Sequence, residues 1–235
     1  MNDKIKGIVL RISDYKDNDL LLCTLCEDKG VLSLVGKSAK KITAKQRFFE
    51  GSIYEFIIDY KEDKTMYSLH GSKIINSYYD LDNIKLLSLK NILFELVIKS
   101  KELYENEMYD NLKFVLENMN EDNKFLLSSL FISYMCKVHG IIPNVDECVI
   151  CKSKKVVAIS NHLGGFLCID HLNGENIKDV STLKRFRLIS KANFKDYEVI
   201  KENEYNYEDF KLITDFFIEN SSLDLKTYEF FRKVY

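Results

Sequence analysis

The stretch Ile5-Lys6-Gly7-Ile8-Val9-Leu10-Arg11 decides the fold of the first third of the chain. It is a short apolar run between charged residues, which is typical of a β-strand. Four similar runs follow between charged turns, at residues 20–25, 31–35, 52–60 and 66–75. Five short strands predict a small barrel, for which the five-stranded OB-fold is a common solution. A plain antiparallel sheet is the alternative.

Beyond residue 81 the apolar residues recur at helical spacing. Helices are therefore expected over residues 84–97, 112–119, 125–138, 183–189 and 210–217, with a last short segment near Tyr228. The third helix should end at Gly140, because the only proline, Pro143, follows it. The sequence thus predicts an α+β chain of several domains, with an OB-fold domain over residues 1–80 and a helical domain over residues 81–235.

Composition limits the class of protein. The 235 residues are 46% hydrophobic and 30% charged, which is typical of a globular protein and not of a disordered one. The net charge of -2 excludes a uniformly basic nucleic-acid coat protein, so any site for a polyanion must be a local patch. No apolar run approaches the ~20 residues that cross a bilayer. A cytoplasmic protein without a membrane partner is expected.

Residues 144–173 lack helical periodicity and carry the most specific motif of the chain. Cys148-Val149-Ile150-Cys151 is followed by Cys168-Ile169-Asp170-His171. Two pairs of ligands at this spacing can surround one zinc ion as a tetrahedron of three thiolates and one imidazole. Four protein ligands leave no open position, so the sequence predicts an inserted knuckle with a structural Zn²⁺. The alternative is that these residues are small core side chains.

The other cysteines are expected to pack in the core. Cys23 and Cys26 resemble a redox pair, but they lie in a predicted strand, where residues three apart face opposite sides. Cys136 lies among the apolar positions of a predicted helix. Buried free cysteines behave as small apolar residues, which is the expectation for all three.

A run of positive charge follows the third predicted strand. No acidic residue occurs between Lys29 and Phe49, and a basic connection leaving a barrel strand is well placed to follow phosphates. The alternative is a solvated lysine-rich loop. Phe48 and Phe49 adjoin the run and could stack on bases, but at least one is expected in the core. We call residues 37–47 the basic segment; its cations are Lys37, Lys40, Lys41, Lys45 and Arg47.

Enzyme chemistry is not expected. Gly36-Lys37-Ser38 resembles the end of a phosphate-binding P-loop, but that motif requires a glycine where Val31 stands. A closed four-ligand metal site also argues against a hydrolase.

The order of several short motifs resembles one bacterial family. The start combines Gly7 to Arg11, Asp14-Tyr15, an acidic turn before Leu20, and a stretch over residues 29–41 that ends in Lys40-Lys41. Later, His139-Gly140-Ile141-Ile142-Pro143-Asn144 leads into the first cysteine pair, and Gly164-Gly165-Phe166 precedes Cys168. This order, over nearly the whole chain, resembles the bacterial DNA repair protein RecO.

The resemblance implies an N-terminal OB-fold, a helical domain with a metal knuckle and no enzymatic activity. It implies a cytoplasmic, nucleoid-associated recombination mediator that binds single- and double-stranded DNA and anneals complementary strands. It also implies partnership with RecR and the single-stranded DNA-binding protein, and indirectly with RecA, whose loading it would assist. The cations of the basic segment carry over as DNA contacts, together with Arg11. His171 departs from the family, in which a fourth cysteine is common.

Two other functions remain as alternatives. An RNA-binding OB-fold protein with a structural zinc site would share the salt-dependent binding but would contact 2′-hydroxyl groups. A metal-dependent hydrolase is the other alternative, and it would turn over a substrate when metal is added.

Overall fold

The computed structural model describes residues 3–44, 47–62, 64, 66–78 and 83–234. The chain forms two compact units. Unit 1 comprises Met1–Asn118 and Thr227–Tyr235, and unit 2 comprises Met119–Lys226. The predicted domain boundary at residues 80 and 81 lies outside the described residues and stays a prediction.

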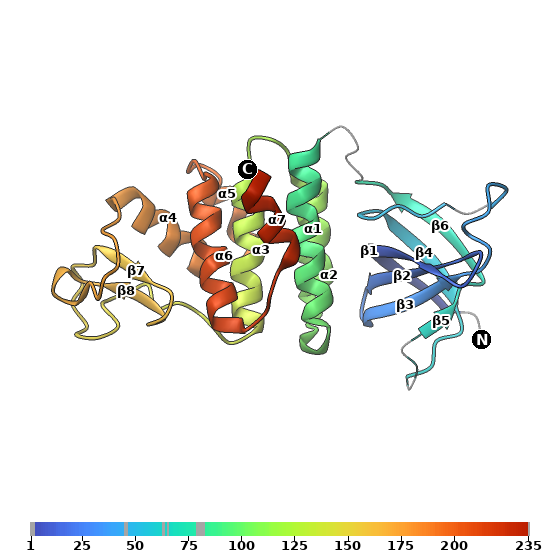
Figure 1. The fold of residues 1–235 in the computed structure, drawn as a ribbon, viewed down its shortest axis with the longest axis horizontal. Helices are drawn as coiled ribbons and strands as arrows, with labels where there is room; N and C mark the ends of the chain where they lie inside the picture. The colour runs from blue at the N-terminus through green and yellow to red at the C-terminus, as the bar shows by residue number, and fades with distance from the viewer. Residues whose placement is uncertain (1–2, 45–46, 63, 65, 79–82, 235) are drawn as a thin grey trace. The chain divides into compact units, whose positions relative to one another are not determined.

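Unit 1 begins with a curled, mixed sheet of six strands, which Figure 1 shows in blue to cyan. The strands lie in the order β5-β3-β2-β1-β4-β6. Their bounds are β1 (Asp3–Tyr15), β2 (Asp19–Cys26), β3 (Gly30–Gly36), β4 (Ile53–Ile58), β5 (Met66–Ser68) and β6 (Gly71–Asn76).

The long first strand explains the curl. Its first half pairs with β4 through Asp3 to Ile8, and the stretch from Gly7 to Tyr15 pairs with β2. The register shifts between Val9 and Arg11, which leaves one extra residue in β1. Such a bulge bends a strand and increases its twist. The bend contributes to the curl of the sheet around β1, which pairs with both β2 and β4.

The sequence predicted one strand over residues 66–75, and the structure has two. Strand β5 runs parallel to β3, whereas β6 runs antiparallel to β4 at the other edge of the sheet. The chain changes partner at Leu69 and His70, where Leu69 N donates to Val35 O and His70 N donates to Ile57 O. Two consecutive residues therefore form hydrogen bonds with strands that lie toward opposite edges of the sheet. The apolar pattern alone did not show this change of partner strand.

The concave side of the sheet holds an apolar core. Val9, Leu22, Leu34 and Phe56 are fully buried there, and the ring of Phe48 packs against Tyr54 with centroids 5.4 Å apart. The unit also contains η1 (Lys101–Leu103) and the helices α1 (Ile84–Lys99), α2 (Glu107–Asn118) and α7 (Lys226–Val234), of which only Lys226 falls outside it.

Helix α7 returns to α1 through a buried carboxylate. Glu95 is 4% exposed, and its Oε2 accepts hydrogen bonds from Thr227 N at 2.8 Å and from Thr227 Oγ1 at 2.6 Å. This carboxylate satisfies an amide at the start of α7, which would otherwise lack a partner within the helix. The start of α7 is thereby tied to α1, within unit 1.

Unit 2 is built around α3 (Lys124–Val138), whose residues are buried on nearly all sides. Helices at the expected positions confirm the period found in the sequence: α4 (Val180–Lys191) and α6 (Tyr207–Ser221) pack against α3 and against each other. Shorter elements complete the unit: β7 (Ala158–Ser160), β8 (Gly165–Leu167), η2 (Ile169–His171), η3 (Phe194–Asp196) and α5 (Tyr197–Ile200). None of the helices among the described residues is long and apolar enough to cross a membrane.

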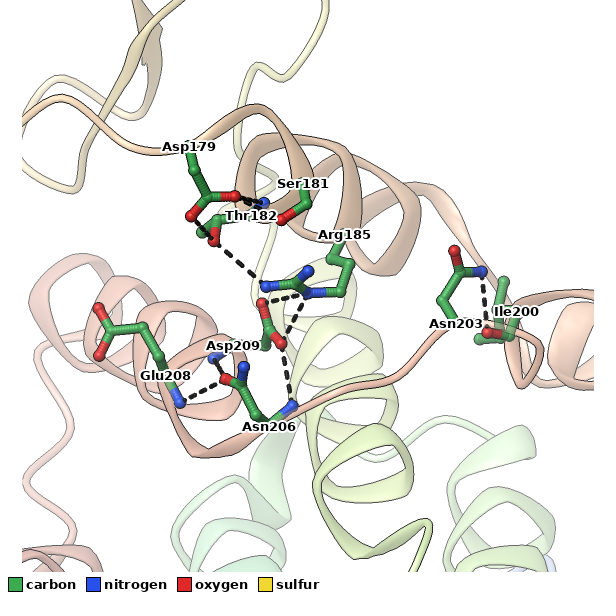
Figure 2. A network of polar contacts seen from close by, with 9 residues as sticks. All are labelled: Asp179, Ser181, Thr182, Arg185, Ile200, Asn203, Asn206, Glu208 and Asp209. Carbon is green, nitrogen blue, oxygen red and sulfur yellow. Dashed lines mark hydrogen bonds and ion pairs between the residues drawn. The ribbon is translucent and has the colours of Figure 1, made fainter.

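A polar network joins α4 to α6 (Figure 2). Arg185 Nε donates to both carboxylate oxygens of Asp209, at 2.9 and 2.8 Å, and Arg185 Nη2 donates to Thr182 Oγ1 at 3.2 Å. Asp179 accepts from Thr182 N at 2.8 Å and caps α4, while Asn206 caps α6. Because α4 is the first α-helix after residues 144–173, this network anchors the helix that follows the cysteine-bearing segment.

Candidate metal centre and nucleic-acid interface

Two tight turns present the four predicted ligands. In the first, Lys152 N donates to Cys148 O at 2.9 Å, and Lys152 adopts a left-handed φ of 64°. In the second, His171 N donates to Cys168 O at 3.1 Å within η2. The hairpin of β7 and β8 lies between them in sequence, and Val149 N donates to Phe166 O at 2.9 Å. These backbone bonds bring the two turns together.

The four donor atoms of Cys148, Cys151, Cys168 and His171 all lie within 4.8 Å of one another. Cys151 Sγ is 3.6 Å from Cys168 Sγ, and Cys168 Sγ is 3.2 Å from His171 Nδ1. Donors at the usual bond lengths around a tetrahedral ion are about 3.5–3.8 Å apart. The cluster can therefore hold a metal ion.

The thiols of this cluster differ in how easily they ionise. Burial opposes ionisation of Cys148, but hydrogen bonds from the backbone of Cys151, Cys168 and Ile150 outweigh it and lower the pKa of Cys148 to about 6. Burial and the neighbouring Cys151 thiol raise the pKa of Cys168. A thiolate is the form that binds metals. The backbone hydrogen bonds therefore favour the metal-binding form of Cys148.

One glycine allows the hairpin to approach the preceding loop. Phe166 N donates to Asn144 O at 2.9 Å. A Cβ atom on Gly165 would lie 2.2 Å from the same Asn144 oxygen, which no side chain tolerates. Gly165 is therefore required by this close approach.

Residues 36–44, which contain most of the basic segment, are folded into consecutive turns. Ala39 N donates to Gly36 O, Lys41 N to Ser38 O and Ala44 N to Lys41 O. Lys37, Lys40 and Lys41 are exposed on this run of turns. The Arg47 guanidinium is also exposed and donates to Ile42 O at 2.8 Å, which ties the end of the segment back to its middle. Four of the five predicted cations are therefore exposed.

The remaining predicted contacts lie elsewhere. Lys45 lies outside the described residues. Arg11 is exposed on β1 opposite Cys23, and Cys23 pairs with Ser33, three residues before Gly36. Phe48 is 8% exposed and belongs to the sheet core, as expected for at least one of the two phenylalanines, whereas Phe49 is 42% exposed.

Sequence reasoning missed the acidic residues beside the basic segment. Lys40 Nζ lies 2.8 Å from Asp14 Oδ2, and Ser38 N donates to Asp19 Oδ1 at 2.8 Å. Strand register explains the contact, because Asp14 pairs with Leu20 and Leu20 pairs with Gly36. Antiparallel pairing of the first three strands, had it been assumed, was the signal that would have placed these carboxylates beside the basic segment.

Core packing of the other cysteines is confirmed for Cys26 and Cys136, each 1% exposed, while Cys23 is half-buried. Burial raises the pKa of Cys136 to about 12, so this thiol stays protonated at neutral pH. It raises the pKa of Cys26 as well. Neither buried thiol is suited to redox or metal chemistry.

Comparison with known proteins gives one family over most of the chain. Residues 1–78 match the N-terminal part of recombination protein O, and residues 81–227 match its C-terminal part. The DNA repair protein RecO of Halalkalibacterium halodurans is 28% identical over 181 residues, covering 72% of this chain and 68% of that protein. The RecO proteins of Mycoplasma mycoides and Bacillus cytotoxicus are 29% and 25% identical, covering 68% and 73% of this chain and 68% and 71% of their own lengths. The chain belongs to the recombination protein O family.

Proposed function

We propose that this chain is a recombination mediator in DNA repair, which binds single- and double-stranded DNA without catalysing a reaction. The observation that carries the proposal is the family match over residues 1–78 and 81–227. The exposed cations at the end of β3 support it, because phosphate contacts from lysine and arginine supply most of the affinity of sequence-independent binding.

The curled sheet is, in this proposal, a five-stranded barrel of the OB type. In that description β5 and β6 are two halves of one bent strand, because residues 66–76 pair with β3 and then with β4. OB-folds bind single strands along a face and its bordering loops. The basic segment leaves β3 at such a border.

Annealing follows from charge neutralisation in this proposal. Two strands repel each other through their phosphates, and a protein that holds strands by the phosphates leaves the bases free to pair. RecR and the single-stranded DNA-binding protein are the proposed partners at the nucleoid, and loading of RecA onto protein-coated single strands is the proposed outcome. Unit 2 is the proposed surface for these contacts.

The metal is proposed to be a structural zinc ion. Three cysteines and one histidine are a donor set that zinc prefers, and four protein ligands leave no position for substrate. Elemental analysis of the purified protein should give about one zinc per chain. A different metal, or none, in a folded protein would contradict this assignment.

The DNA site is tested by replacing Lys37 and Lys41 together with glutamate. Each lost phosphate contact should flatten the dependence of log affinity on log salt by about 0.7 for single strands. The matched control replaces Lys184 and Lys195, two exposed lysines of unit 2, and changes the net charge equally. Equal loss in both variants, or no loss in either, would place the DNA site elsewhere.

The mediator activity is tested by annealing of complementary strands coated with the cognate single-stranded DNA-binding protein. Annealing should proceed in nucleotide-free buffer and fall as salt rises. A requirement for ATP would contradict the proposal. Competition with RNA of the same sequence separates it from an RNA-binding function, for which RNA would be preferred through its 2′-hydroxyl groups.

Recovery of RecR from a bacterial lysate on the immobilised protein tests the partnership. The single-stranded DNA-binding protein should be recovered as well.

A further inference from the structure

The connection between β1 and β2 is an acidic turn beside the basic segment. Within residues 14–19, which we call the acidic turn, Asp14, Asp17 and Asp19 outnumber the single cation Lys16. Pairing of β1 with β2 and of β2 with β3 places this turn next to the residues that follow Gly36. Anionic and cationic groups from two connections therefore meet at the same end of the sheet.

Asp19 acts on the backbone of the basic segment. Its Oδ1 accepts from Ser38 N at 2.8 Å, and Ser38 has a left-handed φ of 54°. The neighbouring Lys40 N donates to Asn18 O at 3.1 Å. These two bonds hold the first turn of the basic segment in a conformation that a serine rarely adopts. Asp19 is therefore a brace for the segment.

Asp14 acts on charge instead. Its Oδ2 lies 2.8 Å from Lys40 Nζ, and the Asp14 side chain is 75% exposed. An ion pair open to water contributes little and is easily exchanged. A phosphate that approaches Lys40 meets a carboxylate already in place, and it can displace that carboxylate without opening the fold.

We propose that Asp14 is an intramolecular competitor of DNA phosphate for Lys40, and that it sets the affinity and exchange rate of the basic segment. The inference rests on the proposed DNA-binding function of that segment. A mediator has to release strands after it has held them, and a competing carboxylate shortens the time that a phosphate stays bound. Asp14 would thus lower the affinity for the strand and speed up its dissociation.

The test compares Asp14→Asn with Asp17→Asn in titrations of single-stranded DNA. Asparagine keeps the shape of the side chain and removes its charge. Asp17 is exposed on the same turn and makes neither of the contacts described above, so its variant reports the general effect of one lost negative charge. Asp14→Asn should bind about two- to fivefold more tightly than the control variant. Its salt dependence should steepen by up to about 0.7, because one more phosphate contact is made.

The same measurements in a Lys40→Gln background show whether Asp14 acts through Lys40. Without the ammonium group, Asp14→Asn should give no gain beyond that of Asp17→Asn. A gain that persists, or equal gains from Asp14→Asn and Asp17→Asn in the wild type, would overturn the proposal. Weaker binding by Asp14→Asn, with an unchanged melting temperature, would also overturn it, because Asp14 would then be a brace.

Failure of the proposed DNA site is a separate result. It is seen when the Lys37 and Lys41 replacements leave DNA binding of the otherwise wild-type protein unchanged.

Discussion

The curled sheet and residues 144–173 hold their structure in different ways. Phe56 and its neighbours form a core that is fully buried by the strands of unit 1. In residues 144–173 one buried cluster contains Cys148, Ala158, Leu167 and Cys168, and two of these four belong to the group of donors that could hold a metal ion. The regular structure there is limited to two strands of three residues and one short 3₁₀ helix. The proposed zinc ion would supplement this small apolar cluster with bonds between its ligands.

Loss of a ligand should have the largest effect. Cys168→Ser is expected to abolish metal binding and to unfold residues 144–173, because binding of a structural zinc supplies on the order of 10 kcal/mol. Metal content and hydrogen exchange of peptides from this segment measure the effect. Cys23→Ser, at a half-buried cysteine of β2, should keep the metal. Unchanged protection of residues 144–173 after metal loss would contradict the contrast between the two regions.

Loss of packing should act on the sheet alone. Phe56→Ala removes a ring that is fully buried and should lower the free energy of unfolding of unit 1 by about 3–5 kcal/mol. Metal content should not change. The control is Ile42→Ala, at a side chain that is 92% exposed, for which a change within about 0.5 kcal/mol is expected. Release of metal by Phe56→Ala would mean that the two regions do not respond separately.

The polar network of α4 and α6 gives a third, intermediate case. Arg185→Ala leaves Asp209, whose side chain is 4% exposed, as a buried charge without its partner and should cost about 3 kcal/mol. Lys191→Ala breaks an ion pair with Asp146 in which both side chains are more than half exposed, and should cost little. Chemical denaturation followed by a probe in unit 2 compares the two variants. Equal losses in the free energy of unfolding would contradict the claim that burial makes the Arg185–Asp209 pair the more important of the two.

Acid should weaken the cap of α4, with the smallest effect of the series. Hydrogen bonds from Ser181 and Thr182 lower the pKa of Asp179 well below its ordinary value. A lowered pKa in the folded state means that the carboxylate stabilises the fold above about pH 4 and that this contribution is lost as the pH falls further. The melting temperature of the wild type should therefore exceed that of Asp179→Asn at neutral pH and approach it below pH 4. A constant difference down to pH 3 would argue against the shift.

Local pattern was sufficient for several helices and for the group of possible metal ligands. The spacing of the cysteine pairs predicted four donors that the structure brings within 4.8 Å, and helical periodicity predicted α3, α4 and α6. Pairing across the sequence was not visible in this way. The bend between β5 and β6 depends on two different partner strands, and Arg185 meets Asp209 only after α4 and α6 have packed. The contact between Asp14 and Lys40 was not visible in the sequence because the two residues belong to different connections.

The return of α7 to unit 1 has a consequence for the order of synthesis. Residues 119–226 are made between the sheet and the helix whose Thr227 meets Glu95. At about 5–20 residues per second, a ribosome spends on the order of ten seconds on that interval. During it, the Glu95 carboxylate of the nascent chain has no hydrogen bond from Thr227. Synthesis of unit 1 thus begins first and ends only after all of unit 2 has been made.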